Sequence, residues 1–473
     1  MATIPTDLAD ASAGALTDMY RQGQASPRET CDAVLARIAQ HNGRINAFVC
    51  VDTEGAQAAA DASTRRWHAG QPLGPLDGVP VSIKDLILTR GLPTLRGSHT
   101  LDIDQPWDVD APASARLREA GAVILGKTTT PEYGCKGETN SPRSGITRNP
   151  WDPGKTAGGS SGGAAAATAS GMGAIAIGTD GAGSVRIPAS FCGNFGFKPS
   201  FGRIPAYPLS PFGTVSHLGP LTRDVRDAAL ALNVLKQPDA RDWTSLPSDP
   251  ADYTRGLEEG VRGLRIAYSP TLGYARNVDP QVAASVHAAV QQLEQLGAIV
   301  EQCDPGFDDP LEITTGLWFL GAWTVWNGLT ARQQAVCDPD FAAQAELGRP
   351  FTALEIQQLH LRRGALGSQM RQFMQHHDLI ATPATAVPAF DALPAGHRPM
   401  SAQTMLGWTP FSYPFNLTQQ PACSVACGLT REGLPIGLQL VGPMFGDALV
   451  LRAARAFEMA SPFSGVAPAM RRA

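Results

Sequence analysis

Apolar and polar positions follow two different periods along the first part of the chain. Residues 26–29 (Ser-Pro-Arg-Glu) combine a capping serine, a proline at the first helical position and a glutamate three residues after the cap. They predict a helix that ends near residues 42–43. Val79, Val81 and Ile83 alternate with smaller or polar residues and predict a strand that ends at Lys84.

The same rhythm of helix and strand continues to the C-terminal end. Further elements are expected as follows: helices over 111–120, 163–169, 280–296 and 446–458, and strands over 122–126, 174–178, 264–268, 298–303 and 379–383. Pro188 can open a short helix that stops near Gly193. Residues 305–375 look less regular and are rich in aromatic residues. The pattern predicts a layered α/β protein.

Composition narrows the class of protein. The chain has 473 residues, 43% of them hydrophobic and 17% charged, which is typical of a globular protein with an ample core. A net charge of −5 without a basic cluster argues against nucleic acid as a partner. No signal peptide is evident over residues 1–10, and no run approaches the ~20 apolar residues of a membrane span. We therefore expect a cytoplasmic protein with no membrane partner.

The eight cysteines do not suggest a metal site. None forms a CxxC motif, and the close pair Cys423 and Cys427 has no histidine nearby. Reduced thiols are the simplest interpretation.

Three segments carry candidate chemistry. Ser184 follows Gly181-Ala182-Gly183, a turn whose small residues can expose successive N–H groups to a developing negative charge. A simple tight turn between strand and helix is the alternative. Ser160 and Ser161 lie in a frame of four glycines, for which a flexible loop is the alternative; a phosphate loop would need a GK[ST] ending.

Lys84 is the candidate base. A free lysine has a pKa of ~10.4, and bringing it near 7 takes a shift of about 3 units, or ~4 kcal/mol. Burial at the end of an apolar strand would act in that direction, and Asp85 should point to the opposite face. A solvent-exposed charge is the common alternative for a lone lysine. Among the histidines, only His217 follows the motif region closely.

Together with the stretch 413–439, these segments resemble the amidase signature family. That stretch contains Tyr-Pro-Phe-Asn-Leu-Thr at 413–418, Gln-Pro at 420–421 and Gly-Leu-Pro-Ile-Gly-Leu-Gln at 433–439. The resemblance covers nearly the whole chain. It implies one α/β domain over 1–473, with a mixed sheet flanked by helices on both faces. N-terminal helices would occupy about 5–70, the signature core about 75–235 and a variable substrate-shaping region about 305–410.

The resemblance also implies roles for individual residues. Members of the family hydrolyse amides through a Ser–cis-Ser–Lys triad and an acyl-enzyme, without a cofactor or metal. Carried over, Ser184 is the nucleophile, Ser160 the serine after a cis peptide bond and Lys84 the base. Gly181, Ala182, Gly183 and Ser184 would supply the oxyanion donors, and Ser161, Asp180 and Arg186 would form the supporting network. Ala182 departs from the usual glycine and could restrict the turn.

The substrate is open at this stage. The resemblance also includes the glutaminase subunit of a tRNA-dependent amidotransferase, but Gly-Arg-Ile-Pro-Ala-Tyr-Pro at 202–208 departs from the pattern of that protein. A stand-alone amidase for a small-molecule amide, possibly a homodimer, is favoured; a silent binding protein on the same fold is a remote alternative. Residues 133–140 and 318–326 would shape the pocket. Core packing explains Trp318, Trp323 and Trp326 at least as well, because residues 318, 319, 322, 323 and 326 have helical spacing. Cys135 is interpreted as filler in the packing near the site.

Overall fold

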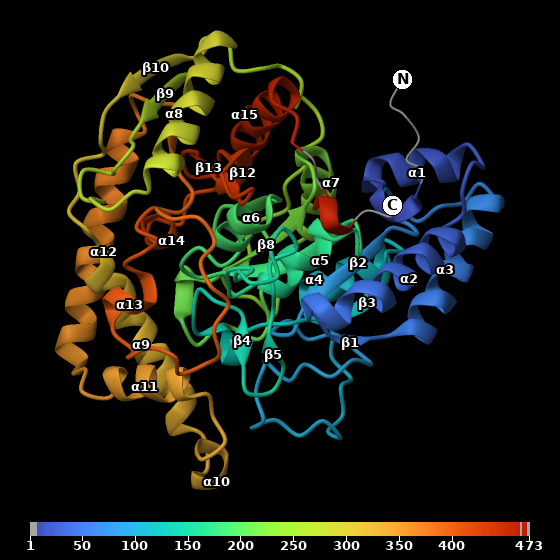
Figure 1. Ribbon diagram of the computed structural model, residues 1–473, viewed down its shortest axis with the longest axis horizontal. Helices are drawn as coiled ribbons and strands as arrows, with labels where there is room; N and C mark the ends of the chain where they lie inside the picture. The colour runs from blue at the N-terminus through green and yellow to red at the C-terminus, as the bar shows by residue number, and fades with distance from the viewer. Residues whose placement is uncertain (1–6, 464–465, 471–473) are drawn as a thin grey trace.

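A mixed sheet of eleven strands runs through the computed structural model, which describes residues 7–463 and 466–470 (Figure 1). The strand order is β1-β3-β2-β6-β8-β7-β12-β13-β11-β9-β10, and β4 and β5 form a separate pair. The strands are β1 Phe48–Val51, β2 Pro80–Lys84, β3 Val123–Thr128, β4 Asn140–Ser141, β5 Gly145–Ile146, β6 Ile175–Asp180, β7 Phe195–Lys198, β8 His217–Thr222, β9 Arg265–Tyr268, β10 Ile299–Gln302, β11 Leu379–Pro383, β12 Ala422–Leu429 and β13 Pro435–Val441.

Helices cover both faces of this sheet, so the predicted fold class is confirmed. Part of the N-terminal prediction falls on residues 1–6, outside the described residues. The α-helices are α1 Ala13–Arg21, α2 Pro27–Ile45, α3 Thr53–His68, α4 Pro112–Glu119, α5 Gly162–Ala169, α6 Arg186–Cys192, α7 Val225–Leu235, α8 Pro280–Gln295, α9 Leu311–Asn327, α10 Ala331–Gln334, α11 Pro339–Gly348, α12 Ala353–Phe373, α13 Ala402–Leu406, α14 Pro414–Leu417 and α15 Asp447–Ala460.

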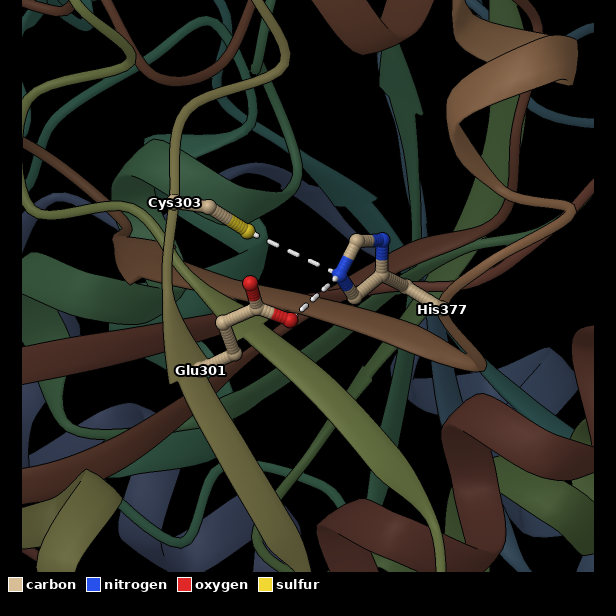
Figure 2. Close-up of side chains that lie close together, drawn as sticks. All are labelled: Glu301, Cys303 and His377. Atoms are coloured by element: carbon tan, nitrogen blue, oxygen red, sulfur yellow. Dashed lines mark hydrogen bonds and ion pairs between the residues drawn. The ribbon is translucent and has the colours of Figure 1, made fainter.

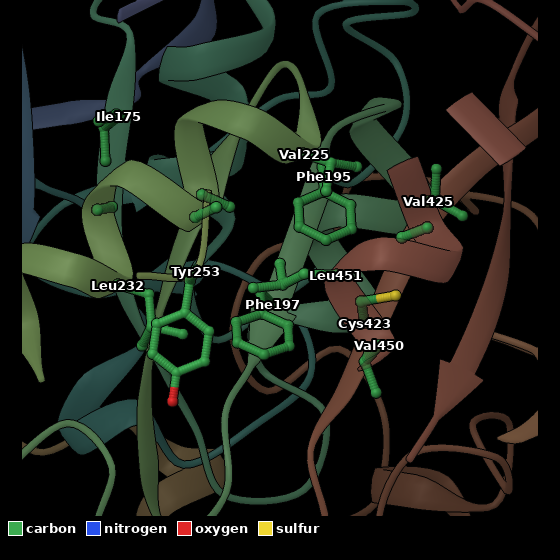
Figure 3. Close-up of a cluster of buried hydrophobic side chains, with 14 of the residues drawn as sticks. Ile175, Phe195, Phe197, Val225, Leu232, Tyr253, Cys423, Val425, Val450 and Leu451 are labelled. Atoms are coloured by element: carbon green, nitrogen blue, oxygen red, sulfur yellow. The ribbon is translucent and has the colours of Figure 1, made fainter. Parts of the chain in front are cut away.

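The two faces have separate apolar cores. On one face, α4, α7, α8 and α15 pack over the strands around Phe195 and Phe197 of β7. Figure 3 shows residues of α7 and α15 near these two rings. On the other face, α2, α3, α5 and α6 pack together, with the alanines of α5 fully buried. Val81 and Ile83 of β2 belong to the first core. Because side chains alternate along a strand, Ser82 and Lys84 point to the face of α5.

Three parallel strands position the candidate site. β2 lies between β3 and β6 and is parallel to both. The carboxyl ends of β2 and β6 therefore meet at one edge of the sheet, which is where ligands bind in many open α/β folds. Lys84 is the last residue of β2, and the loop with Ser184 follows β6 directly.

The expectation for residues 305–375 was wrong, because most of this stretch is helical. It forms α9, α10, α11 and α12, of which α9, α11 and α12 lie at the left of Figure 1. α9 is apolar nearly all round, being buried in its first part on several sides, so no single apolar stripe marks it as a helix.

Two predicted helix ends also shift. The helix expected to end near 42–43 continues to Ile45, where Asn46 adopts a left-handed conformation that ends it. The short helix expected to open at Pro188 starts at Arg186 instead. Among the described helices, none is both long and apolar enough to cross a membrane.

Candidate active site

The Lys84 ammonium is fully buried among hydroxyl groups. Its Nζ donates to Ser160 Oγ at 2.7 Å, Ser161 Oγ at 2.9 Å and Thr179 Oγ1 at 2.8 Å. Asp85 turns away, as expected, and accepts from the N–H groups of Leu95 and Gly97. Lys84 thus has three neutral acceptors and no carboxylate in direct contact.

This environment favours the neutral amine. Burial holds the pKa of the Lys84 ammonium well below its ordinary value, and the more distant charge of Asp180 opposes this only in part. A neutral lysine can donate two hydrogen bonds and accept one, and a hydroxyl can supply the bond it accepts. The Lys84 amine can therefore take a proton from a serine hydroxyl.

Ser160 and Ser161 lie at the start of α5, and the Gly159–Ser160 peptide bond is cis, which the resemblance also implies. The glycines around them are required by close packing. A Cβ on Gly159 would lie 2.6–2.8 Å from backbone atoms of Glu138. Ser161 does more than support the turns, because it contacts Lys84 directly while donating to the Thr179 carbonyl at 3.1 Å.

Asp180 holds the turn that carries Ser184. Its carboxylate accepts from the N–H of Gly183 at 2.8 Å and of Val185 at 3.2 Å, and forms a two-pronged ion pair with Arg186. Burial alone would raise the pKa of Asp180, but the Arg186 guanidinium and its hydrogen bonds bring that pKa below its ordinary value. The carboxylate therefore stays charged and fixes the turn.

Among the expected oxyanion donors, the N–H group of Gly183 is already hydrogen-bonded within the described part of the chain, whereas those of Gly181 and Ala182 are not. The Gly183 N–H is occupied by Asp180, whereas the N–H groups of Gly181 and Ala182 have no acceptor among the described residues. Ala182 was expected to restrict the turn if its φ were positive, but it is not among the described non-glycine residues with positive φ. An alanine at this position therefore meets no left-handed strain.

The Arg186 guanidinium also hydrogen-bonds to residues for which the sequence predicted no role. It donates to the Ser412 carbonyl at 2.9 Å, to Gln439 at 2.8 Å and to Asn416 at 2.6 Å. The Ser412 hydroxyl in turn donates to the Ala182 carbonyl at 2.6 Å. Asn416 and Gln439 belong to the C-terminal motif, which thus closes over the turn at 181–186.

A cavity of about 820 Å³ opens at Ser184. Ser160, Thr179 and Gly181 line it with Ser184, and its walls are mostly apolar or aromatic. The main wall residues are Leu86, Tyr133, Leu209, Phe212, Leu218 and Trp318. The site is suited to a ligand with a sizeable apolar part.

The two stretches expected to shape the pocket divide between lining and packing. Trp318 stacks on Phe212 with ring centroids 3.9 Å apart in the cavity wall. Trp323 and Trp326 pack against a separate cluster with Phe341. Cys135 lies in that cluster and is fully buried, as the filler interpretation expects.

His217 lies outside this cavity. Its Nδ1 is 2.8 Å from the Val215 carbonyl, and burial holds the pKa of the imidazole well below its ordinary value. The ring lines a neighbouring cavity that shares Leu209 and Leu218 with the first. His217 Nδ1 also lies 3.3 Å from the Asp180 carbonyl, but the ring does not line the cavity at Ser184. Ser160, the hydrogen-bond partner of Lys84, does line it, so Lys84 is the better placed candidate base.

A group with mixed metal-ligand chemistry lies elsewhere. Glu301, Cys303 and His377 point toward one another beside the edge strand β10, with His377 Nε2 3.5 Å from Glu301 and 3.6 Å from Cys303 (Figure 2). Thiolate, imidazole and carboxylate could together hold a zinc-like ion. None of the three lines the cavity at Ser184.

Comparison with known proteins identifies the family. The Amidase family model matches residues 29–451, so the chain belongs to the amidase signature family. An acylamidase of Rhodococcus erythropolis is 37% identical over 451 residues, covering 94% of both chains. A glutamyl-tRNA(Gln) amidotransferase subunit of Myxococcus xanthus is 36% identical, covering 93% of this chain and 95% of the relative.

A solved structure agrees with these relatives. The crystal structure of a bacterial aryl acylamidase of the amidase signature family superposes with a TM-score of 0.89 at 31% identity, covering 96% of this chain and 97% of the other. The predicted family is confirmed.

Proposed function

We propose that this chain is an amidase that hydrolyses a carboxylic acid amide at a non-peptide C–N bond, with Ser184 as nucleophile. The observation that carries the proposal is the buried Lys84 amine, 2.7 Å from Ser160 and without a carboxylate partner, beside the cavity that Ser184 lines. Such an amine is basic enough to accept a proton and is neutral often enough to do so.

The proton path runs over two serines. Ser184 Oγ attacks the amide carbonyl as its proton passes to Ser160 Oγ, whose own proton passes to Lys84 Nζ. The tetrahedral intermediate then collapses: the C–N bond breaks, and the proton returns from Lys84 through Ser160 to the leaving nitrogen. Water, deprotonated along the same path, cleaves the acyl-enzyme to the carboxylic acid and frees Ser184.

The oxyanion would be bound by the N–H groups of Gly181 and Ala182, with the N–H of Ser184 completing the set. Each such donor typically contributes about 3 kcal/mol in the transition state. The Gly183 N–H is a weaker candidate than the sequence suggested, because it donates to Asp180.

The apolar and aromatic cavity favours an aryl or otherwise apolar amide that releases ammonia or an amine. The names of the relatives agree with this choice, since acylamidase and aryl acylamidase are among them. We propose one domain over residues 1–473, and a homodimer stays a prediction.

The test is amine or ammonia release from a panel of anilides, aliphatic amides and glutamine, with Ser184→Ala in parallel. We expect turnover of at least one anilide by the wild-type protein and none by the variant. An organophosphorus probe should label Ser184 in the wild type only. Hydrolysis that persists in Ser184→Ala would overturn the proposal.

The amidotransferase relatives support a second candidate function, that of the glutaminase component of such an enzyme. Hydrolysis of glutamine alone within the panel would favour it over the stand-alone amidase. A silent binding protein would show neither turnover nor labelling of Ser184.

A further inference from the structure

One charged residue lines the cavity at Ser184 in the described part of the chain. Arg96 is the only Asp, Glu, Lys, Arg or His among the described lining residues. Its guanidinium forms no ion pair or hydrogen bond with another described residue, whereas Arg66 and Arg186 each pair with an aspartate. A half-buried cation in an apolar cavity with no protein counter-charge has its hydrogen-bonding capacity free for a ligand.

The backbone presents Arg96 in an uncommon conformation. Arg96 has φ +56°, which non-glycine residues adopt rarely and at a cost of about 1 kcal/mol or more. The Asp85 carboxylate clamps this conformation, accepting from the N–H of Leu95 at 2.9 Å and of Gly97 at 3.0 Å. Asp85 follows Lys84 directly, so the same strand end fixes both the lysine and the arginine turn.

Contacts connect the arginine turn to the reacting serines. The Arg96 carbonyl accepts from the N–H of Tyr133 at 2.8 Å, and Tyr133 lines the cavity. The next residue is Gly134, on which a Cβ would lie 3.4 Å from Ser160 Oγ. Arg96 therefore belongs to the wall segment that borders Ser160.

We propose that Arg96 forms an anion subsite for a carboxylate on the amide substrate, in its acyl part or in its leaving amine. The inference rests on the proposed amidase function and narrows its substrate to amides that carry a carboxylate beside an apolar or aryl group. A guanidinium pairs with a carboxylate through two parallel hydrogen bonds, which an uncharged isostere cannot reproduce.

The experiment uses two isosteric pairs of substrates. Succinanilic acid and levulinic acid anilide differ by carboxylate against acetyl in the acyl part; 4-acetamidobenzoate and 4-acetamidoacetophenone differ in the same way in the amine. We expect kcat/KM for the carboxylate of at least one pair to exceed that of its isostere roughly 10- to 100-fold, mostly through KM. The advantage should shrink as salt is added.

Variants test whether Arg96 causes the preference. Arg96→Gln should lower the ratio within that pair at least tenfold, and Arg96→Lys should restore part of it. Both keep a non-glycine residue in the left-handed turn, so the backbone cost is matched. Arg65→Gln, which removes an exposed arginine of α3, should leave the ratio unchanged.

Failure of the subsite can be told apart from failure of the amidase. Hydrolysis without preference in either pair, or a ratio unmoved by Arg96→Gln, overturns the subsite alone. No turnover of any amide overturns the proposed function. Calorimetry on Ser184→Ala measures binding without turnover: tighter binding of a carboxylate than its isostere, lost on adding Arg96→Gln, supports the subsite, and equal binding overturns it.

Discussion

Lys84 illustrates how burial without a carboxylate in direct contact can lower the pKa of a lysine far enough for the role of base proposed here. Replacing it by methionine keeps the length and removes the proton acceptor. We expect Lys84→Met to lower kcat about 100- to 10,000-fold, the usual range for loss of general base catalysis. Amide hydrolysis is the measurement, with circular dichroism to verify folding. Lys155→Met, which removes a partly exposed lysine paired with Asp391, is the control and should retain activity.

The pH dependence follows from the same group. Only neutral Lys84 accepts a proton, so kcat/KM should rise with pH through the pKa of Lys84. Because burial lowers that pKa, this acid limb should lie well below the ordinary lysine value of 10.5. A limb centred near 10.5 would contradict the assignment.

Replacing Thr179 should shift the pKa of Lys84 in a direction that the structure predicts. Its hydroxyl accepts a hydrogen bond from the Lys84 ammonium at 2.8 Å and so favours the charged form. Removing it in Thr179→Val should lower the pKa of Lys84 and move the acid limb to lower pH. A limb that stays or moves upward would show that Thr179 does not stabilise the ammonium. A pH–rate profile of both proteins decides between these results.

Among single residues, the sequence predicted those whose candidate role follows from their neighbours in the chain. Lys84 at a strand end, Ser160 among glycines and Ser184 after a glycine turn could be recognised from local pattern and resemblance. Thr179 and Ser412 could not, because their roles depend on segments brought together only by the fold. Ser412 acts on Ala182 across 230 positions of sequence.

At the scale of elements, the turn between β6 and α6 should tolerate substitution at Ala182 better than at Gly183. Gly183 has φ +119°, and a Cβ there would lie 2.4 Å from Ser412 Oγ and 2.5 Å from Ser412 Cβ. Gly183→Ala should therefore cost roughly 2 kcal/mol or more in unfolding free energy and most of the activity. Ala182→Gly is the matched change and should cost about 1 kcal/mol or less. Urea unfolding and amide hydrolysis measure both; equal effects would contradict the described turn.

The ion pair that spans this turn should be worth far more than one on a surface helix. Asp180 and Arg186 are both fully buried. Arg186→Leu leaves a buried carboxylate without its partner, so we expect a loss of about 3–5 kcal/mol in unfolding free energy. Arg28 also contacts two aspartates, but on the surface of α2, and Arg28→Leu should change stability little. Similar losses from urea unfolding of the two variants would refute the contrast.

Element prediction succeeded where the sequence had one dominant period. α2 begins with a full capping box, and β2 alternates cleanly, so both were predicted at their first residues or within one. α12 was missed, and only Leu359, Leu366 and Met370 of it are buried. For α9, helical spacing was recognised over residues 318–326, but its bounds were not predicted because its apolar residues lie on several sides. In the structure α9 packs against both α11 and α12, which pattern along the chain does not reveal.

In the whole molecule, the cavity is built between the sheet that carries the serines and the helical layer that contains α9. Trp318 of α9 lies against the turn proposed to bind the oxyanion, since a Cβ on Gly181 would be 2.7 Å from its ring. Its ring also stacks on Phe212, from the loop before β8. The proposed substrate-binding wall therefore depends on the docking of a layer that supplies none of the proposed reacting groups.

This arrangement predicts that two tryptophans of α9 differ in their effect on substrate selectivity. Trp318→Leu should weaken selection of an anilide over a small aliphatic amide roughly fivefold, because an aromatic contact is worth about 1 kcal/mol. Trp326 packs against Phe341 outside the cavity, so Trp326→Leu should leave that ratio of kcat/KM unchanged while lowering thermal stability. If both variants lose selectivity equally, the helical layer acts through its docking alone; if neither does, the aryl moiety binds elsewhere in the cavity and Trp318 is packing. Selectivity that falls only in Trp318→Leu would tie the choice of substrate to the one tryptophan whose ring faces the cavity at Ser184.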